Sequence, residues 1–121
     1  MRNLLFALLV VVFAEASLGQ LSGSLSGTLG PGEYHIADTI LVESSDSLLL
    51  MPGTIFNFDR PYPFLIYGVL LAEGTESNSI IFTTDTLANH NRWFGLQFNY
   101  FISSGSRLAY CVIEYSRAKG T

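Results

Sequence analysis

The stretch between residues 47 and 84 repeats one strand–turn–strand pattern almost twice. The segment 48–54, LLLMPGT, returns with a 21-residue spacing as the segment 69–75, VLLAEGT. Each copy is a short apolar run followed by a Gly-Thr turn and a second apolar run, which is 55–58 in the first copy and 80–82 in the second. A fixed period with this content predicts a solenoid, in which each repeat buries its apolar face against its neighbours.

Short apolar runs separated by turn residues continue along the rest of the chain, and we expect no helix after residue 19. We expect strands at 33–42 (with a break at Ala37 and Asp38), 48–51, 55–58, 64–67, 69–72, 80–84, 93–100 and 108–115. An antiparallel sandwich would have a similar pattern. The 21-residue spacing, and apolar runs such as LLL and FLI that lack in–out alternation, favour stacked parallel strands.

Five residues are expected to make the structural turns: Pro52, Gly53, Gly68, Gly74 and Gly95. Pro52 presets the first corner of a type II turn, and Gly53 accepts the positive φ of the second. Glycines at 32, 53, 74 and 95 fall on the 21-residue spacing, but only the flanks of Gly53 and Gly74 match. We therefore expect a positive φ at Gly74 also.

The segment 1–19 has the pattern of an export signal that forms a helix. Arg2 is the positive start, the segment 4–14 is the apolar core, and cleavage is expected after Ala16 or Gly19. An uncleaved membrane anchor is the alternative, but a spanning helix needs about 20 apolar residues, more than this core provides. The segment 20–32 is rich in Gly and Ser and is expected to form a leader, a cap or an irregular first strand.

Composition excludes several classes of function. Charged residues make up 13% of the chain and the net charge is −4, which disfavours a nucleic-acid partner because phosphate binding needs clustered Lys and Arg. The single cysteine, Cys111, cannot form an intrachain disulfide or anchor a zinc site, and we expect it to be buried in a strand. We expect no cofactor, no metal and no catalytic residue.

Five motifs together point to a family. They are Pro52-Gly53-Thr54, Gly68-x-Leu70-x-Ala72-x-Gly74-Thr75, Ile80-x-Phe82-Thr83, Trp93-x-Gly95-Leu96-x-Phe98 and Leu108-x-Tyr110-Cys111-x-Ile113-Glu114-Tyr115. Over residues 33–117 they resemble the secreted bacterial right-handed parallel β-helix repeat proteins of the pectin-lyase-like superfamily. The resemblance implies an all-β solenoid with three short parallel sheets along its axis. It says little about function, because the matching residues are those that form the coils.

The length of the chain is enough for only a few coils of this kind. Residues 33–121 would form part of a stack of roughly four coils of ~20–25 residues each. Solenoids need capped ends, and the last expected strand lies close to Thr121. We therefore expect the β-helix to be incomplete at the C-terminus, and to associate with itself through an open last coil.

Two groups of residues are candidates for a site. Asp85, His90 and Arg92 share the longest polar loop, but one Asp is too few for a calcium cage of about 6–8 oxygens, so a solvated loop is the favoured interpretation. An aromatic platform for sugar rings could be formed by Trp93, Phe94, Tyr100 and Tyr62. The competing and favoured interpretation is that these rings pack in the core, since aromatic side chains dominate small cores.

These observations predict a secreted or cell-surface protein that is not an enzyme. We expect a structural or adhesive β-helix scaffold whose partner is an extracellular polysaccharide or another cell-surface component. One alternative is the N-terminal part of a polysaccharide lyase or glycoside hydrolase with its catalytic coils beyond Thr121. The other is an envelope protein anchored by its uncleaved signal.

Overall fold

The structure of the chain is a computed structural model that describes residues 19–99 and 105–118. This part is all-β and contains no helix, and its paired strands are parallel. No described segment has the helical length and hydropathy that crossing a membrane requires. The predicted signal helix, residues 1–19, lies outside the described ranges except for Gly19.

The strands are short, apart from one. They are β2 (Gln20–Ser24), β3 (Gly27–Leu29), β4 (Gly32–Val42), β5 (Ser47–Leu50), β6 (Thr54–Phe58), β7 (Phe64–Ile66), β8 (Val69–Glu73), β9 (Ile80–Thr83), β10 (Leu96–Phe98), β11 (Arg107–Ala109) and β12 (Cys111–Ile113). The long strand β4 runs without a break through Ala37 and Asp38, so the break expected there is wrong. The chain changes its pairing partner at this point instead.

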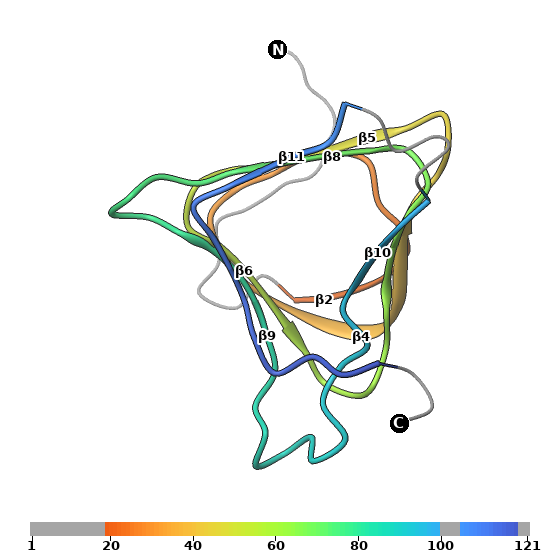
Figure 1. Cartoon of the computed structure of the whole chain (residues 1–121), viewed down its shortest axis with the longest axis vertical. Coiled ribbons are helices and arrows are strands. Elements are labelled where there is room, and N and C mark those ends of the chain that lie inside the picture. The colour runs from red at the N-terminus through yellow and green to blue at the C-terminus, as the bar shows by residue number, and fades with distance from the viewer. Residues whose placement is uncertain (1–18, 100–104, 119–121) are drawn as a thin grey trace.

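The strands form two sheets that enclose one interior. The four-stranded sheet has the order β11-β8-β5-β3, and we call it the first wall. The seven-stranded sheet has the order β10-β7-β4-β6-β9-β12, with β2 also on β4. Because β4 pairs with β6 through Gly32–Ile36 and with β7 through Ile40–Val42, this sheet is curled into two arms. Figure 1 shows the triangular outline that results, with β5, β8 and β11 along one side.

We call the arm of β6, β9 and β12 the second wall, and the arm of β7 and β10 the third wall. Residues that are paired on neighbouring strands become further apart in the sequence toward the C-terminus. On the second wall Gly32 is opposite Thr54, Ile55 is opposite Ile81, and Ile80 is opposite Cys111, so the separation grows from one pair to the next. The additional residues lie in the corners, so the strands stay paired while the connections lengthen.

The register of the repeat differs from the sequence expectation by one position. Leu48 lies opposite Leu70 and Leu50 opposite Ala72, so the spacing is 22 and not 21. The reason is the alternation of side chains along a strand, since a slip by one position would turn every inward side chain outward. All four of these side chains are buried, whereas the expected superposition would place Leu48 beside Val69, which is only half-buried.

Inward side chains from the three walls fill the interior as one core. Aromatic rings occupy much of it: Phe56 meets Phe82 edge-on at 5.7 Å between ring centroids, and Phe58 is stacked on Trp93. The fully buried large side chains are Trp93, Phe56, Phe58, Phe64, Phe82, Ile36, Ile40, Leu48, Leu50, Ile66, Leu70 and Ile80. Since apolar burial is the main favourable term in folding, this shared core holds the walls together.

The predicted turn glycines act in two different ways. Gly53, which follows Pro52, has a φ of 89°, and Gly95 has a φ of 81°. Gly74 is not among the described glycines of positive φ, so that expectation is wrong. A Cβ at Gly74 would instead lie 2.8 Å from the carbonyl oxygen of Tyr110. Gly68 is more crowded still, because a Cβ there would meet the carbonyl oxygens of Glu43 and Asp46.

Candidate functional site

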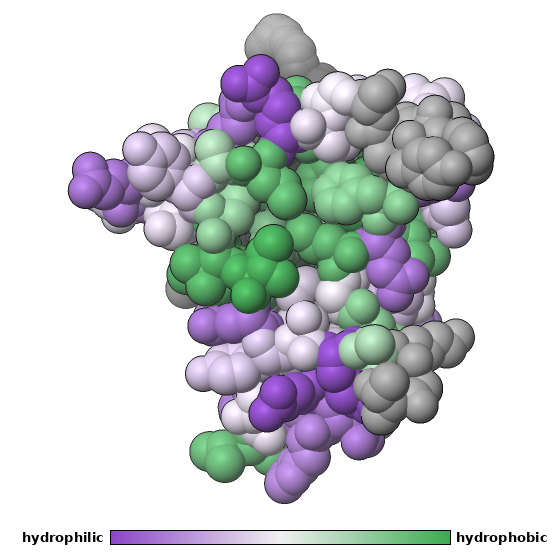
Figure 2. Space-filling view, viewed as in Figure 1, coloured by the Kyte–Doolittle hydropathy of each residue, from purple (hydrophilic) through white to green (hydrophobic). Residues whose placement is uncertain are grey.

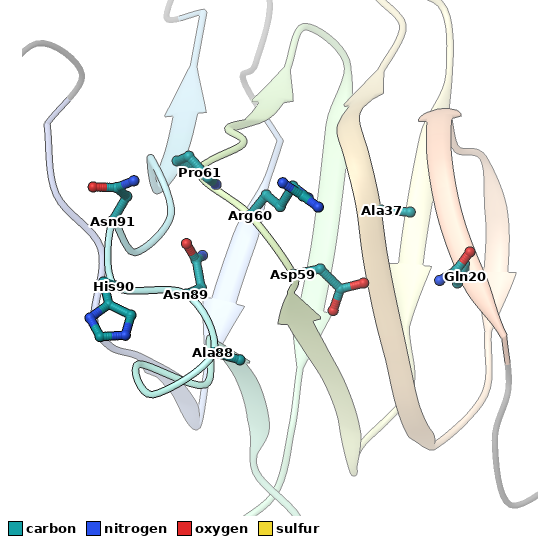
Figure 3. A pocket seen from close by; sticks show the side chains of 9 residues that line it. All are labelled: Gln20, Ala37, Asp59, Arg60, Pro61, Ala88, Asn89, His90 and Asn91. Atoms are coloured by element: carbon teal, nitrogen blue, oxygen red, sulfur yellow. The ribbon is translucent and has the colours of Figure 1, made fainter.

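A polar cleft lies at the corner where the chain passes from the second wall to the third. The strand-to-strand connections there are residues 59–63 and 84–95, and the equivalent point in β4 is its change of pairing partner. The cleft has a volume of about 580 Å³. Its lining residues are Gln20, Ala37, Asp59, Arg60, Pro61, Ala88, Asn89, His90 and Asn91. Figure 3 shows Asp59 and Arg60 between Gln20 and the loop that carries His90 and Asn91.

A second, smaller hollow continues the cleft over the second wall. Its volume is about 240 Å³, and it shares Asp59, Ala88 and Asn89 with the first. It reaches the outward side chains of His35 and Asn57, which are opposite each other in the register of β4 and β6. The two hollows form one trough, which we call the corner trough. Carboxylate, amide, imidazole and guanidinium groups face it from successive strands and corners.

The loop 84–92 is fixed from within by buried polar contacts. Asn89 is only 6% exposed, and its Nδ2 donates to Oγ1 of Thr84 at 3.1 Å and to the carbonyl oxygen of Arg92 at 2.9 Å. Thr84 in turn donates to the carbonyl oxygen of Phe58 at 2.5 Å, which ties the loop to β6. Because buried polar groups are costly when unpaired, these contacts hold the loop in one conformation. The positions of His90 and Asn91 at the cleft are therefore fixed by the hydrogen bonds of the loop.

A chain of polar contacts starts at Asp59 in the corner trough and continues to Glu33 beside it. Nδ1 of His35 lies 3.0 Å from Oδ1 of Asp59, and its Nε2 lies 3.7 Å from Oε2 of Glu33. Asn57 donates from Nδ2 to the same Glu33 oxygen at 2.8 Å. These side chains are partly exposed, so each keeps further hydrogen-bonding capacity toward solvent or a ligand. Carboxylates and amides arranged in this way can accept from and donate to the hydroxyl groups of a polar ligand.

The described aromatic candidates for sugar contact are buried or half-buried, so these three do not form an exposed platform. Trp93 has no exposed surface, and its Nε1 donates to the carbonyl oxygen of Glu114 at 2.8 Å, so its role as a sugar contact is wrong. Tyr62 packs against the core and is half-buried. The ring of Phe94 is half-buried and lies 5.5 Å from the guanidinium carbon of Arg117. Tyr100 falls outside the described residues.

The loop candidates Asp85, His90 and Arg92 are separated by the structure. His90 lines the main cleft, and Asp85 lines the smaller hollow. Oδ1 of Asp85 accepts from the backbone N–H of Leu87 at 3.0 Å, so this carboxylate organises its own loop. Arg92 has a φ of 64° and is exposed. Within residues 19–99 and 105–118, no three His, Cys, Asp or Glu side chains are grouped so that they could hold a metal ion.

Cys111 lies away from the corner trough, on the last strand of the second wall. It is half-buried, and its Sγ donates to the carbonyl oxygen of Ala72 at 3.2 Å. Burial raises the pKa of this thiol, and the contact with the Ala109 carbonyl oxygen opposes the shift. The cysteine is therefore less reactive than an exposed thiol at neutral pH.

Sequence reasoning did not identify Gln20, His35, Asn57, Asp59 and Arg60 as residues of the trough. A signal for two of them was present, because the separation of His35 and Asn57 in the chain equals the register that β4 and β6 adopt. The others come from corners whose lengths vary, so no fixed spacing connects them. Comparisons of the chain with protein-family models, with curated proteins and with solved structures find no match.

Proposed function

We propose that this chain is an exported right-handed parallel β-helix of roughly four coils that serves as a non-enzymatic scaffold and binds an extracellular polysaccharide in its corner trough. The fold part of the proposal is supported by the parallel ladders, in which each wall receives its next strand after a circuit of the other two. The handedness follows from the strong preference of parallel strand–crossover–strand connections for the right-handed form. A crystal structure of the protein tests it directly.

The observation that carries the functional proposal is the composition and direction of the corner trough. It is lined by side chains that both donate and accept hydrogen bonds, including Asp59, Arg60, Asn91 and Gln20. These residues come from corners stacked along one direction, from β2 to the loop after β9, so the trough suits an extended chain with repeated hydroxyl groups. The volume of about 580 Å³ lies in the range of ligand sites.

A binding role is favoured over catalysis by how the carboxylates are used. Glycoside hydrolysis needs two carboxyl groups that flank the bond, one of them acting as an acid. Of the two carboxylates that line the trough, Asp59 contacts His35 and Asp85 is held by the backbone of its own loop. Both carboxylates thus already serve contacts within the chain, and neither is shown held as a protonated acid. The trough therefore fits a role in holding a ligand.

The extracellular part of the proposal is supported by the sequence. The apolar core that follows Arg2 and the small residues at Ala14 and Ala16 are typical of an export signal. A surface location provides polysaccharide as a partner. Structural or adhesive function then follows from holding such a chain at the cell surface.

The test is retardation of the native protein in gels that contain one soluble polysaccharide each. We expect retardation by at least one neutral polysaccharide, and at least a tenfold weaker affinity for Asp59→Asn, which corresponds to about 1.4 kcal/mol. Glu76→Gln is the charge-matched control, because Glu76 is exposed in the connection between β8 and β9, outside the trough. Equal retardation of the two variants, or no retardation by any polysaccharide, would contradict the proposal. Release of reducing ends from a retained polymer would contradict the non-enzymatic role.

A further inference from the structure

The end of the molecule formed by β10, β11 and β12 exposes an apolar surface. We call these three the end strands. Six large apolar or aromatic side chains on or beside them are between 39% and 61% exposed, and we call them the end patch: Phe98, Leu108, Tyr110, Val112, Ile113 and Tyr115. Figure 2 looks onto this end, and hydrophobic side chains gather near its centre. Soluble monomers seldom expose contiguous apolar patches of more than a few hundred Å².

Three members of the end patch continue the columns of the core. Phe98 lies opposite Ile66, Leu108 opposite Ala72, and Ile113 opposite Phe82 in the parallel register. Their partners on β7, β8 and β9 have no exposed surface, because each is covered on both sides along the stack. Phe98, Leu108 and Ile113 are covered on one side only. They are core positions that lack one layer of neighbours.

The end strands also present unpaired edges. Within the described residues, β10, β11 and β12 each pair with one neighbour and occupy the ends of their sheets. Such edges present backbone N–H and C=O groups to any strand that approaches. In Figure 1 the end strands lie along three sides of the triangular outline. A single extended peptide could pair with one side only, whereas a second triangular end can face all three.

The charges of this end are compatible with a second copy. None of the six residues of the end patch is charged. Two charged side chains of the described residues on its rim already have partners within the chain: Arg107 contacts Glu73 at 2.6 Å, and Glu114 accepts from Thr83 at 2.7 Å. When two like ends meet, Arg107 keeps its ion pair, so its charge is not left buried without a partner, which would be costly.

The area of the end patch is sufficient for a specific dimer. At roughly 200 Å² for a large side chain, the exposed fractions give on the order of 500 Å² for each copy. Two copies would then bury about 1,000 Å² together, which is the lower limit for a specific interface. The opposite end offers less, because Leu21, Leu25 and Leu29 are partly buried and pack against the core. Contact between like ends buries the patch on both copies, and it closes after two subunits.

From these observations we propose that two copies of the chain associate end to end through the end patch, related by a two-fold axis, with the end strands of each copy facing those of the other. This surface is separate from the corner trough, so the dimer and the polysaccharide site can be tested independently. Dimerisation would also give the protein two troughs, and hence two points of attachment to one polymer.

The test is sedimentation equilibrium of the native protein over a wide range of concentration under reducing conditions. We expect a monomer–dimer equilibrium, and a dissociation constant at least about tenfold higher for Leu108→Arg. Met51→Arg is the matched control, because Met51 is 40% exposed, as is Leu108, but lies between β5 and β6 away from the end strands. A monomer at every concentration would overturn the proposal. Growth into polymers without limit would overturn the two-fold arrangement.

A second measurement needs no substitution. Cys111 is the single cysteine of the chain and lies on β12, at the same end. In the dimer it is covered, so the rate of its reaction with a thiol reagent falls as protein concentration rises. A rate that does not depend on concentration, in a sample that sediments as a dimer, would place the contact elsewhere and overturn the proposal.

Discussion

The indole ring of Trp93 lies nearly parallel to the ring of Phe58, with 4.3 Å between the ring centroids and 15° between the ring planes. Phe58 is the last residue of β6, and Trp93 follows the long loop after β9. The stack therefore closes that loop onto an earlier strand, beside the contacts of Asn89. It also explains why a tryptophan at this position serves the core and not a ligand.

Replacing Trp93 tests this closure. We expect Trp93→Ala to lower the free energy of unfolding by about 3–5 kcal/mol, because a large buried ring is lost and a cavity remains. Trp93→Phe keeps a ring on Phe58 but loses the hydrogen bond to the Glu114 carbonyl oxygen. It should lower the free energy of unfolding by about 1–3 kcal/mol. Urea unfolding followed by circular dichroism measures both. Equal losses for the two variants would show that the ring stack contributes little.

Gly68 is expected to be the glycine least tolerant of a side chain. A Cβ there would clash with the carbonyl oxygens of both Glu43 and Asp46, so the backbone must move. Gly68→Ala should destabilise the protein by about 3 kcal/mol or more. Gly30→Ala is the control, since a Cβ at Gly30 has nothing within 4 Å. This variant should raise the free energy of unfolding by no more than about 1 kcal/mol. Thermal unfolding of the two variants gives the comparison.

Tyr34 is expected to couple stability to alkaline pH. Burial raises the pKa of Tyr34 above its ordinary value of 10.0, and the hydrogen bond to the Gly30 carbonyl oxygen opposes the shift. The folded state then holds the proton more tightly than the unfolded state. This contribution is fully present below about pH 10 and is lost as the pH rises through the folded-state pKa.

The substitution Tyr34→Phe isolates that contribution. At neutral pH it should cost about 1 kcal/mol, because the hydroxyl donates to the Gly30 carbonyl oxygen at 3.0 Å. Above about pH 10 the difference between the parent and Tyr34→Phe should shrink, because the parent alone loses the stabilising protonation. Urea unfolding at pH 7 and near pH 11 measures it. A difference that grows with pH has the wrong sign and would refute the assignment.

Asn89 is expected to determine the order of the loop 84–92. Asn89→Leu removes the hydrogen-bond donors to Thr84 and to the Arg92 carbonyl oxygen. It should lower the free energy of unfolding by about 1–3 kcal/mol. The loop should then be cut faster by a protease, because its opening becomes easier. Asn91→Ala, at an exposed neighbour that lines the trough, should leave the cleavage rate unchanged. Similar rates for both variants would show that Asn89 does not hold the loop.

Much of the strand pattern was predictable because short apolar runs, separated by turn residues, mark the strands. The runs at 55–58, 64–67 and 69–72 correspond closely to β6, β7 and β8. The register was not predictable in the same way. Aligning the two repeats by residue similarity places Leu48 opposite Val69. In the structure Leu48 is opposite Leu70, because this register buries both side chains. Sequence similarity between repeats shows which residue types recur. It does not determine the register, which depends on which face of each strand is buried.

The glycines show a second limit of the sequence. Gly53 and Gly74 have similar flanks, yet only Gly53 has a positive φ. Gly74 is required by the approach of the Tyr110 backbone, which comes from a much later part of the chain. A close approach of this kind depends on the stacking of distant segments, so local turn chemistry cannot reveal it. The corner trough could not be predicted for the same reason, because its residues come from separate corners that only the stacking brings together.

The growing separation of paired residues on the second wall, from Gly32 and Thr54 to Ile80 and Cys111, shows where this architecture can accept change. Lengthening at a corner leaves the ladders on both sides intact, because hydrogen bonding depends on the strands and not on the path between them. Insertions during evolution can therefore create new surface at a corner without a new core. By the same logic a binding loop could be grafted at residues 84–92, while the walls supply the folding energy.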